Sequence, residues 1–414
     1  MPTKLIEKID FERLKSDIIS LSEIGKSPDR GIYRMSFSPA DIQAREWLLK
    51  RYKDAGLEAR IDGAGNIIGK LKGKDESKSW LIGSHIDTVP AGGHLDGSLG
   101  VLCGLEVARS IKDSKIQLNE SLEIISFTDE EGRFGGLFGS EAFCGELTPD
   151  RIHNAIDLSG LSIIEAMKTV GLDAMDALHA KRNPNSISGY LELHIEQGPV
   201  LDTMHIPIGI VEEITGLFKW QVVLSGAANH AGTTPMNMRK DAFQGLCEFS
   251  LEIPRILEEN GSDKSVATIG KVNIFPGSAN TVPGRVDFSL DVRDTNEEIL
   301  EELFVSFRKS LSAIARRRGL MFEFDVLSQV KPAHSDKQIL DSIQKSCEAQ
   351  GIKFHRMPSG AAHDAQIMAR MTKIGMIFVP SKNGRSHSPA EWTPWEDIEL
   401  GANVLLNTIL ELAN

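Results

Sequence analysis

The sequence predicts an α/β protein of two domains, in which a smaller ferredoxin-like α+β domain is inserted into a larger one. The larger domain is built from two segments and has a mixed sheet flanked by helices. Three observations predict this fold. The chain has 414 residues, whereas single hydrophobic cores rarely grow past roughly 250–300 residues. Apolar strands alternate with helices over residues 1–212 and 332–414. Between them, residues 213–331 follow the order β-α-β-β-α-β of ferredoxin-like domains.

The elements of the larger domain begin with a helix whose start is well marked. Ser38 offers an N-cap, Pro39 suits the first turn, Asp41 is an early carboxylate, and Gly56 can end the helix. The next expected elements are strands at 66–71 and 80–84, a helix of small residues near 100–110, and a strand at 121–128. After residue 330 we expect a helix near 336–349, strands near 353–356 and 373–379, and a final helix to residue 412.

The inserted domain is expected to contain four strands and two helices. The strands are predicted at 218–224, 267–274, 285–292 and 321–327, and the helices at about 239–259 and 297–317. One face of the second helix is apolar at helical spacing, through Leu300, Leu303, Phe304, Phe307, Leu311 and Ile314. Thr295 and Glu298 are expected to form its capping box.

Composition excludes several classes of protein. Lys and Arg total 46 against 58 Asp and Glu, which gives a net charge of −12 and argues against a nucleic-acid partner. The four cysteines are scattered without a Cys-x-x-Cys pair, so neither a disulfide framework nor a thiolate zinc site is expected. Residues 1–21 mix apolar and charged residues and lack the apolar core of a signal peptide, and no stretch is long enough for a membrane span. We therefore expect a cytoplasmic protein without a membrane partner.

Histidine and acidic residues follow the apolar strands of the larger domain. His85 and Asp87 share a face at the end of one strand, where a carboxylate can orient an imidazole that binds a metal. Asp96 lies in a glycine-rich turn before a helix. Taken singly, the first pair is more typical of a local hydrogen bond, and Asp96 of an Asp-Gly turn. His94 is expected to be exposed in this loop, or at most to contact a ligand residue.

Two further strands end in the same way. Glu130 and Glu131 follow the strand at 121–128, and because neighbouring extended residues point apart, one carboxylate can bind a metal while the other acts as general base. The alternative is an acidic, solvated loop. His194 and Glu196 are two residues apart after another apolar strand, so on an extended backbone they would share a face. His387 lies in a polar loop after the strand at 373–379.

Together these clusters are more specific than any one of them. Ligands gather at the carboxyl ends of strands in open α/β sheets, so we expect the side chains to meet. Imidazole and carboxylate without thiolate suit zinc, manganese, nickel or cobalt, and a shared aspartate suits a pair of metal ions.

Seven motifs carry a resemblance to a known family. They are 83–89 (GSHIDTV), 96–97 (DG), 127–132 (FTDEEG), 192–198 (ELHIEQG), 230–235 (HAGTTP), 358–364 (PSGAAHD) and 386–391 (SHSPAE). In this order, over nearly the whole chain, they resemble the hydantoinase/carbamoylase family of amidohydrolases, in the clan of two-metal aminoacylases and carboxypeptidases. The resemblance implies hydrolysis of the ureido C–N bond of an N-carbamoyl-L-amino acid to the amino acid, carbon dioxide and ammonia.

Alternative functions stay open at this point. Within the family they are allantoate or ureidoglycolate hydrolysis, and, less in keeping with the motifs, hydrolysis of an N-acyl amino acid or dipeptide. Outside enzymes, the chain could be a metal-dependent binding protein that has lost catalysis. The presence of Glu130 argues against this, because a metal site alone does not require a second carboxylate that is not a ligand.

Carried over residue by residue, the resemblance implies two divalent metal ions per chain (zinc, manganese, cobalt or nickel). Asp96 would bridge them, with His85 and His194 completing one site and Glu131 and His387 the other. Two further residues are implied as catalytic. Glu130 would be the general base and Asp87 the partner of His85. The clan's peptidases usually have a carboxylate where this chain has His194, so the chain is similar to the carbamoyl-type branch.

The resemblance also implies a set of substrate contacts. In the inserted domain, His230 would face the developing oxyanion, and Asn280 and Arg293 would bind the substrate carboxylate; Gln197 and Gly360 would line the same pocket. The planar guanidinium of arginine suits a carboxylate because it can bind it with two hydrogen bonds.

Two points about the inserted domain remain as expectations. Without the family, Arg293 is better interpreted as forming a strand-end salt bridge with Asp291 or Asp294. The family further implies that the inserted domain serves as a lid and pairs with a second copy into a homodimer, in which a lid histidine can reach the partner's site.

Overall fold

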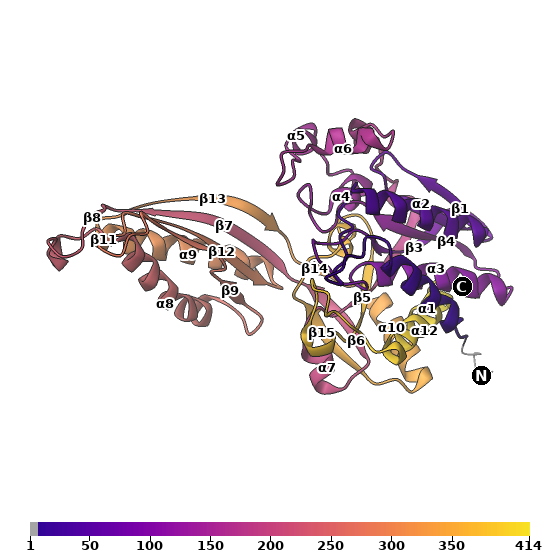
Figure 1. The fold of residues 1–414 in the computed structure, drawn as a ribbon. Coiled ribbons are helices and arrows are strands. Elements are labelled where there is room, and N and C mark those ends of the chain that lie inside the picture. The colour runs from indigo at the N-terminus through magenta and orange to yellow at the C-terminus, as the bar shows by residue number, and fades with distance from the viewer. Residues whose placement is uncertain (1–6) are drawn as a thin grey trace. The chain divides into compact units, whose positions relative to one another are not determined.

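The computed structural model describes residues 7–414, so residues 1–6 of the N-terminal segment considered above lie outside the described part. The chain divides into two compact units, each with its own sheet and helices (Figure 1). Within the described range, the larger unit comprises residues 7–212 and 334–414, and the inserted unit comprises residues 213–333. The second boundary thus follows residue 333, against residue 331 from the sequence. No helix in the described range is both long and apolar enough to span a membrane.

The larger unit contains a mixed sheet, as the sequence predicted. Its strand order is β1-β2-β4-β3-β5-β16-β6-β14, with β15 beside β6. Strands β4, β3, β5 and β16 are parallel, whereas β1 pairs antiparallel with β2, β2 with β4, and β6 with β16. The strands are β1 Glu58–Ile61, β2 Ile67–Leu71, β3 Asp75–His85, β4 Glu120–Phe127, β5 Ile187–Ile195, β6 Ile208–Ile214, β14 Ala333–His334, β15 Phe354–Ser359 and β16 Ile374–Val379.

Helices pack against this sheet in one large core. The core joins apolar residues of the long helices to the strands β3, β4 and β5. The long helices are α1 Phe11–Ser22, α2 Pro39–Asp54, α3 Ser98–Asp113, α10 Lys337–Gln350 and α12 Trp395–Leu412. Five shorter helices are α4 Phe138–Cys144, α5 Pro149–His153, α6 Ile163–Thr169, α7 Val200–Met204 and α11 Asp364–Met368. A second, separate core contains the buried residues of α4, α5 and α6.

Close packing explains the small residues of α3. A Cβ on Gly100 would lie 2.4 Å from the backbone oxygen of Leu193 in β5, and one on Gly104 would lie 2.8 Å from the side chain of Ile82 in β3. The glycines therefore allow α3 to lie directly on the sheet, which brings its first turn to the carboxyl ends of β3 and β5.

Helix ends follow the sequence in one case and depart from it in another. The Ser38 side chain accepts the backbone N–H of Asp41 and caps α2, and Gly56 adopts a left-handed conformation just after the helix, as expected. The predicted capping box at Thr295 is wrong. The N-cap of α9 (Glu297–Arg318) is Asn296, whose side chain accepts the N–H groups of the second and third helical residues, while Thr295 is buried.

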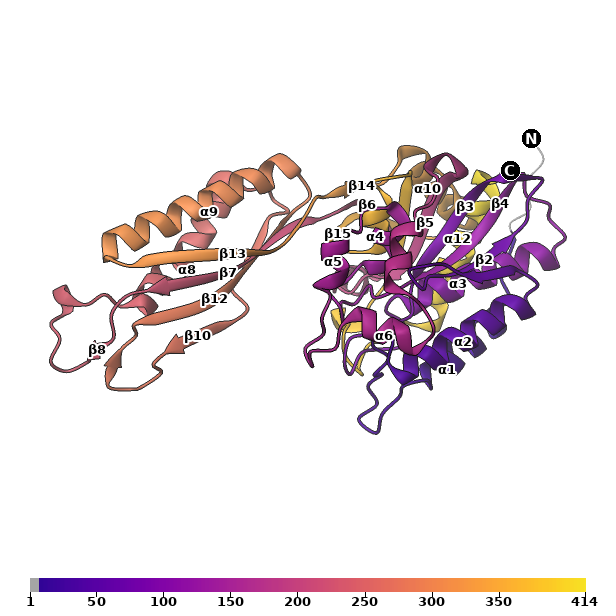
Figure 2. The same cartoon turned by 90° about the horizontal axis from the view of Figure 1, so that it is seen from above.

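The inserted unit has the predicted ferredoxin-like order. Its sheet runs β10-β12-β7-β13 with β9 also on β12, all antiparallel, and α8 and α9 cover one face of it (Figures 1 and 2). The strands are β7 Gly216–Ser225, β9 Val266–Thr268, β10 Val272–Phe275, β12 Arg285–Asp294 and β13 Met321–Val330; α8 is Ala242–Asn260. The single strand expected at 267–274 is thus two strands, separated where Ser289 bonds the backbone of Lys271. A small ribbon joins β8 Asn229–His230 to β11 Thr281–Val282.

Candidate metal centre

Polar side chains of the larger unit converge at the carboxyl ends of its parallel strands. His85 ends β3, Glu130 and Glu131 follow β4, His194 lies near the end of β5, and His387 follows β16. Asp96 joins them from the turn that begins α3. All of these side chains except that of His387 are largely buried.

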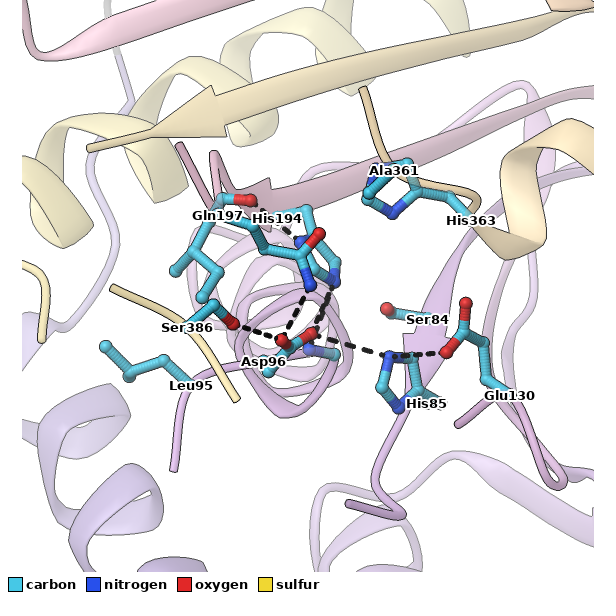
Figure 3. Close-up of polar contacts among 12 residues, drawn as sticks. Ser84, His85, Leu95, Asp96, Glu130, His194, Gln197, Ala361, His363 and Ser386 are labelled. Atoms are coloured by element: carbon cyan, nitrogen blue, oxygen red, sulfur yellow. Dashed lines mark hydrogen bonds and ion pairs between the residues drawn. The ribbon is translucent and has the colours of Figure 1, made fainter. Parts of the chain in front are cut away.

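Asp96 lies at the centre of the cluster (Figure 3). Its Oδ1 is 3.2 Å from Nε2 of His194 and 3.8 Å from Nε2 of His85. Its Oδ2 is 3.3 Å from Nε2 of His387, which is in turn 3.6 Å from Oε2 of Glu131. Each oxygen of Asp96 therefore belongs to a separate ligand group, one with His85 and His194 and the other with Glu131 and His387.

Backbone carbonyls orient two of the histidines. Nδ1 of His85 is 3.1 Å from the carbonyl oxygen of Asp87, and Nδ1 of His194 is 2.9 Å from that of Ile195. When Nδ1 donates to a carbonyl, Nε2 keeps a lone pair for a metal. The carboxylate of Asp87 is a more distant neighbour of His85, at 3.7 Å, and it accepts the N–H of Glu131 instead. Asp87 thus orients His85 mainly through its backbone.

The charge of the cluster fits a divalent cation. Burial raises the pKa of Glu130, and the adjacent Glu131 raises it further; burial and then Asp96 do the same for Glu131. Burial also lowers the pKa of His85 to about 4, so this histidine is neutral. Burial opposes the charged form of His194 as well, but the contact with Asp96 raises its pKa to about 9, and the same carboxylate raises the pKa of His387. The carboxylates of Asp87, Asp96, Glu130 and Glu131 still outnumber these two imidazoles. Oε1 of Glu131 is buried and has no hydrogen-bond partner within residues 7–414. Buried carboxylates in excess of cationic partners are costly unless a metal compensates them, so the residues present fit a pair of cations.

Glu130 has a different position from its neighbour. Its Oε2 is 3.5 Å from Nε2 of His85, and it belongs to neither ligand group around Asp96. The two adjacent carboxylates therefore face different partners, as expected, although they lie in a bend after β4 and not on an extended backbone. Glu130 is placed beside the ligands, where it could hold a proton.

The structure adds residues for which the sequence indicated no role. Ser386 donates to Oδ2 of Asp96 at 2.6 Å, and Glu391 accepts the backbone N–H of Asp96 at 3.1 Å. His363 lies against His194, with ring centroids 4.6 Å apart, and forms a further candidate ligand group with His194 and Glu192. All of these lie inside the motifs quoted above, which is the only signal in the sequence that could have identified them.

Two local expectations are corrected. His94 is not exposed; it is half-buried, its ring lies 5.8 Å from that of Trp392, and burial lowers its pKa to about 4. Glu196 does not share the site with His194. The strand β5 ends at Ile195, and the Glu196 carboxylate accepts the N–H groups of Val200 and Leu201 at the start of α7.

The expected substrate contacts fall in both units. In the larger unit, Gln197 donates to Oδ2 of Asp96 at 2.7 Å, and Gly360 has open space where a Cβ would lie. In the inserted unit, His230 pairs with Thr281, which places it beside Asn280 on the β8–β11 ribbon.

Arg293 forms an ion pair in β12. Its Nε is 2.9 Å and its Nη2 is 3.2 Å from the two carboxylate oxygens of Asp291. This is the strand-end salt bridge that the residues alone suggested.

Known proteins resemble this chain over nearly its whole length. The model of the peptidase family M20/M25/M40 matches residues 81–411. The N-carbamoyl-L-amino acid amidohydrolase of Geobacillus stearothermophilus is 37% identical over 409 residues, which cover 98% of this chain and 99% of that protein. The allantoate amidohydrolase of Escherichia coli (strain K12) is 35% identical over 399 residues, 95% of this chain and 96% of that protein.

A solved structure agrees with these relatives. An amidase of the hydantoinase/carbamoylase family from Burkholderia multivorans has a TM-score of 0.90 and 32% identity, covering 98% of both chains. Enzymes of the M20 family are generally dinuclear metal hydrolases, and the ligand groups around Asp96 suit that chemistry. The chain therefore belongs to the peptidase family M20/M25/M40, within its hydantoinase/carbamoylase amidohydrolases, and is a hydrolase of C–N bonds in linear amides.

Proposed function

We propose that the protein uses two divalent metal ions to hydrolyse the ureido C–N bond of an N-carbamoyl-L-amino acid, releasing the amino acid, carbon dioxide and ammonia. One observation carries this proposal: each oxygen of Asp96 faces its own ligand group, and Glu130 lies beside His85 of the first group without belonging to either group. The relative from Geobacillus stearothermophilus supports this substrate class.

The chain's own residues supply binding and proton transfer in this reaction. Bound metal ions would polarise the ureido carbonyl and lower the pKa of water. Glu130 takes a proton from the attacking water and returns it to the leaving nitrogen. Gln197 and Gly360 line the substrate pocket, and Asp87 holds both His85 and the backbone of Glu131 in place.

His230 is suited to donate a hydrogen bond to the oxyanion. Its Nδ1 accepts the backbone N–H groups of Gly232 and Thr233, at 3.1 and 3.2 Å. Since Nδ1 is an acceptor, Nε2 carries the ring proton, and the side chain is exposed. An Nε2–H group held in this way can stabilise developing negative charge.

The spacing of three residues within the inserted unit supports a shared site in a homodimer. His230 and Asn280 lie on the ribbon that continues from the Arg285 end of β12, whereas Arg293 lies near its other end. Arg285 and Arg293 are eight residues apart, roughly 26 Å at about 3.3 Å per residue. One copy therefore cannot present all three residues to one small ureido acid. We propose that a second copy supplies His230 and Asn280.

A second substrate is favoured by one observation, the 35% identity to the allantoate amidohydrolase of Escherichia coli. Allantoate also combines a carboxylate with a ureido group, so the same residues could bind it. A panel of N-carbamoyl-L-amino acids, allantoate, ureidoglycolate and N-acetyl amino acids decides between them. The protein is stripped with chelator and reloaded separately with zinc, manganese, cobalt or nickel, and ammonia and amino acid release are measured.

The panel has three informative results. Highest kcat/KM for N-carbamoyl-L-amino acids supports the proposal, and highest kcat/KM for allantoate replaces it with the second candidate. Full activity in metal-free protein, or activity that saturates at one equivalent of metal, would contradict the two-metal reaction itself.

A further inference from the structure

We propose that Glu391 is a positioning residue that holds the His387 side of the metal centre in place, so that one of the two metal positions depends on it for affinity. This inference rests on the two-metal function proposed above. Glu391 follows His387 by four residues, and its side chain reaches back to the turn that carries Asp96. It is buried, at 3% exposure, and lies in neither ligand group around Asp96.

The contacts of Glu391 join two loops that are far apart in the sequence. Its Oε1 accepts the backbone N–H groups of Leu95 and Asp96, at 2.8 and 3.1 Å. Its Oε2 is 3.0 Å from the hydroxyl of Ser386. The same hydroxyl is 2.6 Å from Oδ2 of Asp96, a contact that Figure 3 shows. One carboxylate therefore connects the backbone of the Asp96 turn to the beginning of the His387 loop.

The Asp96 turn is shaped around this carboxylate. A Cβ on Gly93 would lie 2.2 Å from the carboxylate carbon of Glu391, so only glycine allows the turn to approach it this closely. On the other side, the backbone N–H of Glu391 donates to the carbonyl of Ser388, which closes the loop that carries His387. Both loops are thus tied to Glu391 by their backbones.

His387 differs from the other histidines in how its ring is held. Nδ1 of His85 and of His194 each lies within hydrogen-bond distance of a backbone carbonyl. In residues 7–414, no such partner is found for Nδ1 of His387, whose side chain is 50% exposed and whose backbone is left-handed, with φ of 53°. The position of this ring therefore depends on the conformation of its loop, and Glu391 is the buried group that connects the loop to Asp96.

Metal titration of Glu391→Ala tests the inference. Residues that orient ligands typically change metal affinity by about 10–100-fold when mutated. We expect wild-type protein to bind two manganese ions. Glu391→Ala should retain the first manganese ion, and its Kd for the second manganese ion should rise at least about tenfold. Glu391→Gln should lie between them, because its amide oxygen can still accept the two N–H groups accepted by Oε1. Metal analysis after dialysis gives the number of bound manganese ions, and calorimetric titration gives their Kd values. Circular dichroism confirms folding.

A matched control variant, and a comparison in protein that lacks the His387 side chain, make the test selective. Asp336→Ala removes another carboxylate that accepts two backbone N–H groups, at the start of α10, and should leave both metal ions bound. His387→Ala should bind one metal ion, and adding Glu391→Ala should not weaken it further, because both changes act on the same position.

The results separate the inference from the proposed function. Wild-type binding by both Glu391 variants, or equal weakening of both positions, would overturn the positioning role. A further loss of affinity in the double variant would overturn it as well. If Glu391→Ala does not fold, the comparison of Glu391→Gln with wild type decides alone. A rise in the Kd for the second metal ion, with the Kd for the first unchanged, supports the role. Any other result contradicts it. Wild-type protein that binds fewer than two metal ions instead contradicts the two-metal function.

Discussion

At the scale of single residues, the two adjacent glutamates in the bend after β4 show how neighbouring side chains can face different partners. Glu131 faces His387 and Asp96, and its backbone N–H is held by Asp87. Glu130 faces His85 and joins neither ligand group. The two carboxylates share strong burial and raised pKa values but differ in what they contact. Their substitution should therefore have different consequences.

Glu130→Gln should retain both metal ions and lower kcat by at least about a hundredfold, the loss expected when a general base is removed. Glu131→Gln should lose metal instead, because it removes a charged ligand. Metal analysis of the purified variants, paired with steady-state kinetics, distinguishes the two. The reverse pattern would exchange the roles of the adjacent pair.

Gly97→Ala should displace His85. Gly97 has φ of 63°, and a Cβ there would lie 2.3 Å from the ring of His85. Gly351→Ala is a matched control, with φ of 67° and open space around its Cβ, so it has only the backbone strain of about 1–2 kcal/mol. We expect both variants to melt at lower temperature but only Gly97→Ala to lose metal. Retention of two metal ions by Gly97→Ala would show that the ring can move without consequence.

Arg293→Lys tests the proposed carboxylate contact against the ion pair with Asp291 that the structure shows. Lysine keeps the charge but cannot form two parallel hydrogen bonds to a carboxylate. We expect KM to rise far more for a free-acid substrate than for its amide. Equal changes for the two substrates would leave Arg293 with the ion pair alone.

At the scale of elements, the start of α9 shows how a helix cap is chosen between neighbours. Asn296 accepts the N–H groups of Glu298 and Ile299, at 2.8 and 3.2 Å, whereas Thr295 is buried, at 5% exposure. Asn296→Ala should therefore lower the free energy of unfolding by about 1 kcal/mol, measured by urea denaturation. Glu301→Ala, on the exposed surface of the same helix, should change it by much less. A similar loss in both variants would remove the cap as the cause.

At the scale of the whole molecule, the units have separate cores and carry different parts of the proposed reaction. The candidate metal ligands all lie in the larger unit, and His230, Asn280 and Arg293 lie in the inserted unit. Because β12 separates Arg293 from the other two, we propose that a second copy supplies His230 and Asn280. This proposal can be tested directly.

A mixture of Glu130→Gln and His230→Ala proteins tests the shared site. After reversible dissociation and random pairing, half of the dimers are mixed. If His230 acts across the interface, one of the two sites in each mixed dimer has both residues, so activity should recover to about a quarter of wild type by two-fold symmetry. If His230 acts within its own chain, every site keeps one defect and nothing recovers. No recovery, with mixed dimers shown to form, would remove the shared site and leave the hydrolase assignment unchanged.

The order of elements and the chemistry of the centre could be predicted from the sequence because both depend on local patterns. Short apolar runs predicted β3, β4, β5 and β16, and Ser38 with Pro39 predicted the start of α2. Side-chain parity separated Glu130 from Glu131. The supply of imidazole and carboxylate at several strand ends indicated a metal pair, and the family motifs extended this to individual ligands.

Only the tertiary structure decided which distant groups meet. Ser386 and Asp96 are 290 residues apart in the sequence, and Glu391 and Asp96 are 295 apart. Their contacts depend on how α3 packs on the sheet and where the loop after β16 runs, and no local periodicity records this. The same reason explains one of the errors: the burial of His94 against Trp392 follows from packing between distant segments. Local sequence thus determined what each element offers to the site, and packing determined which partners it meets.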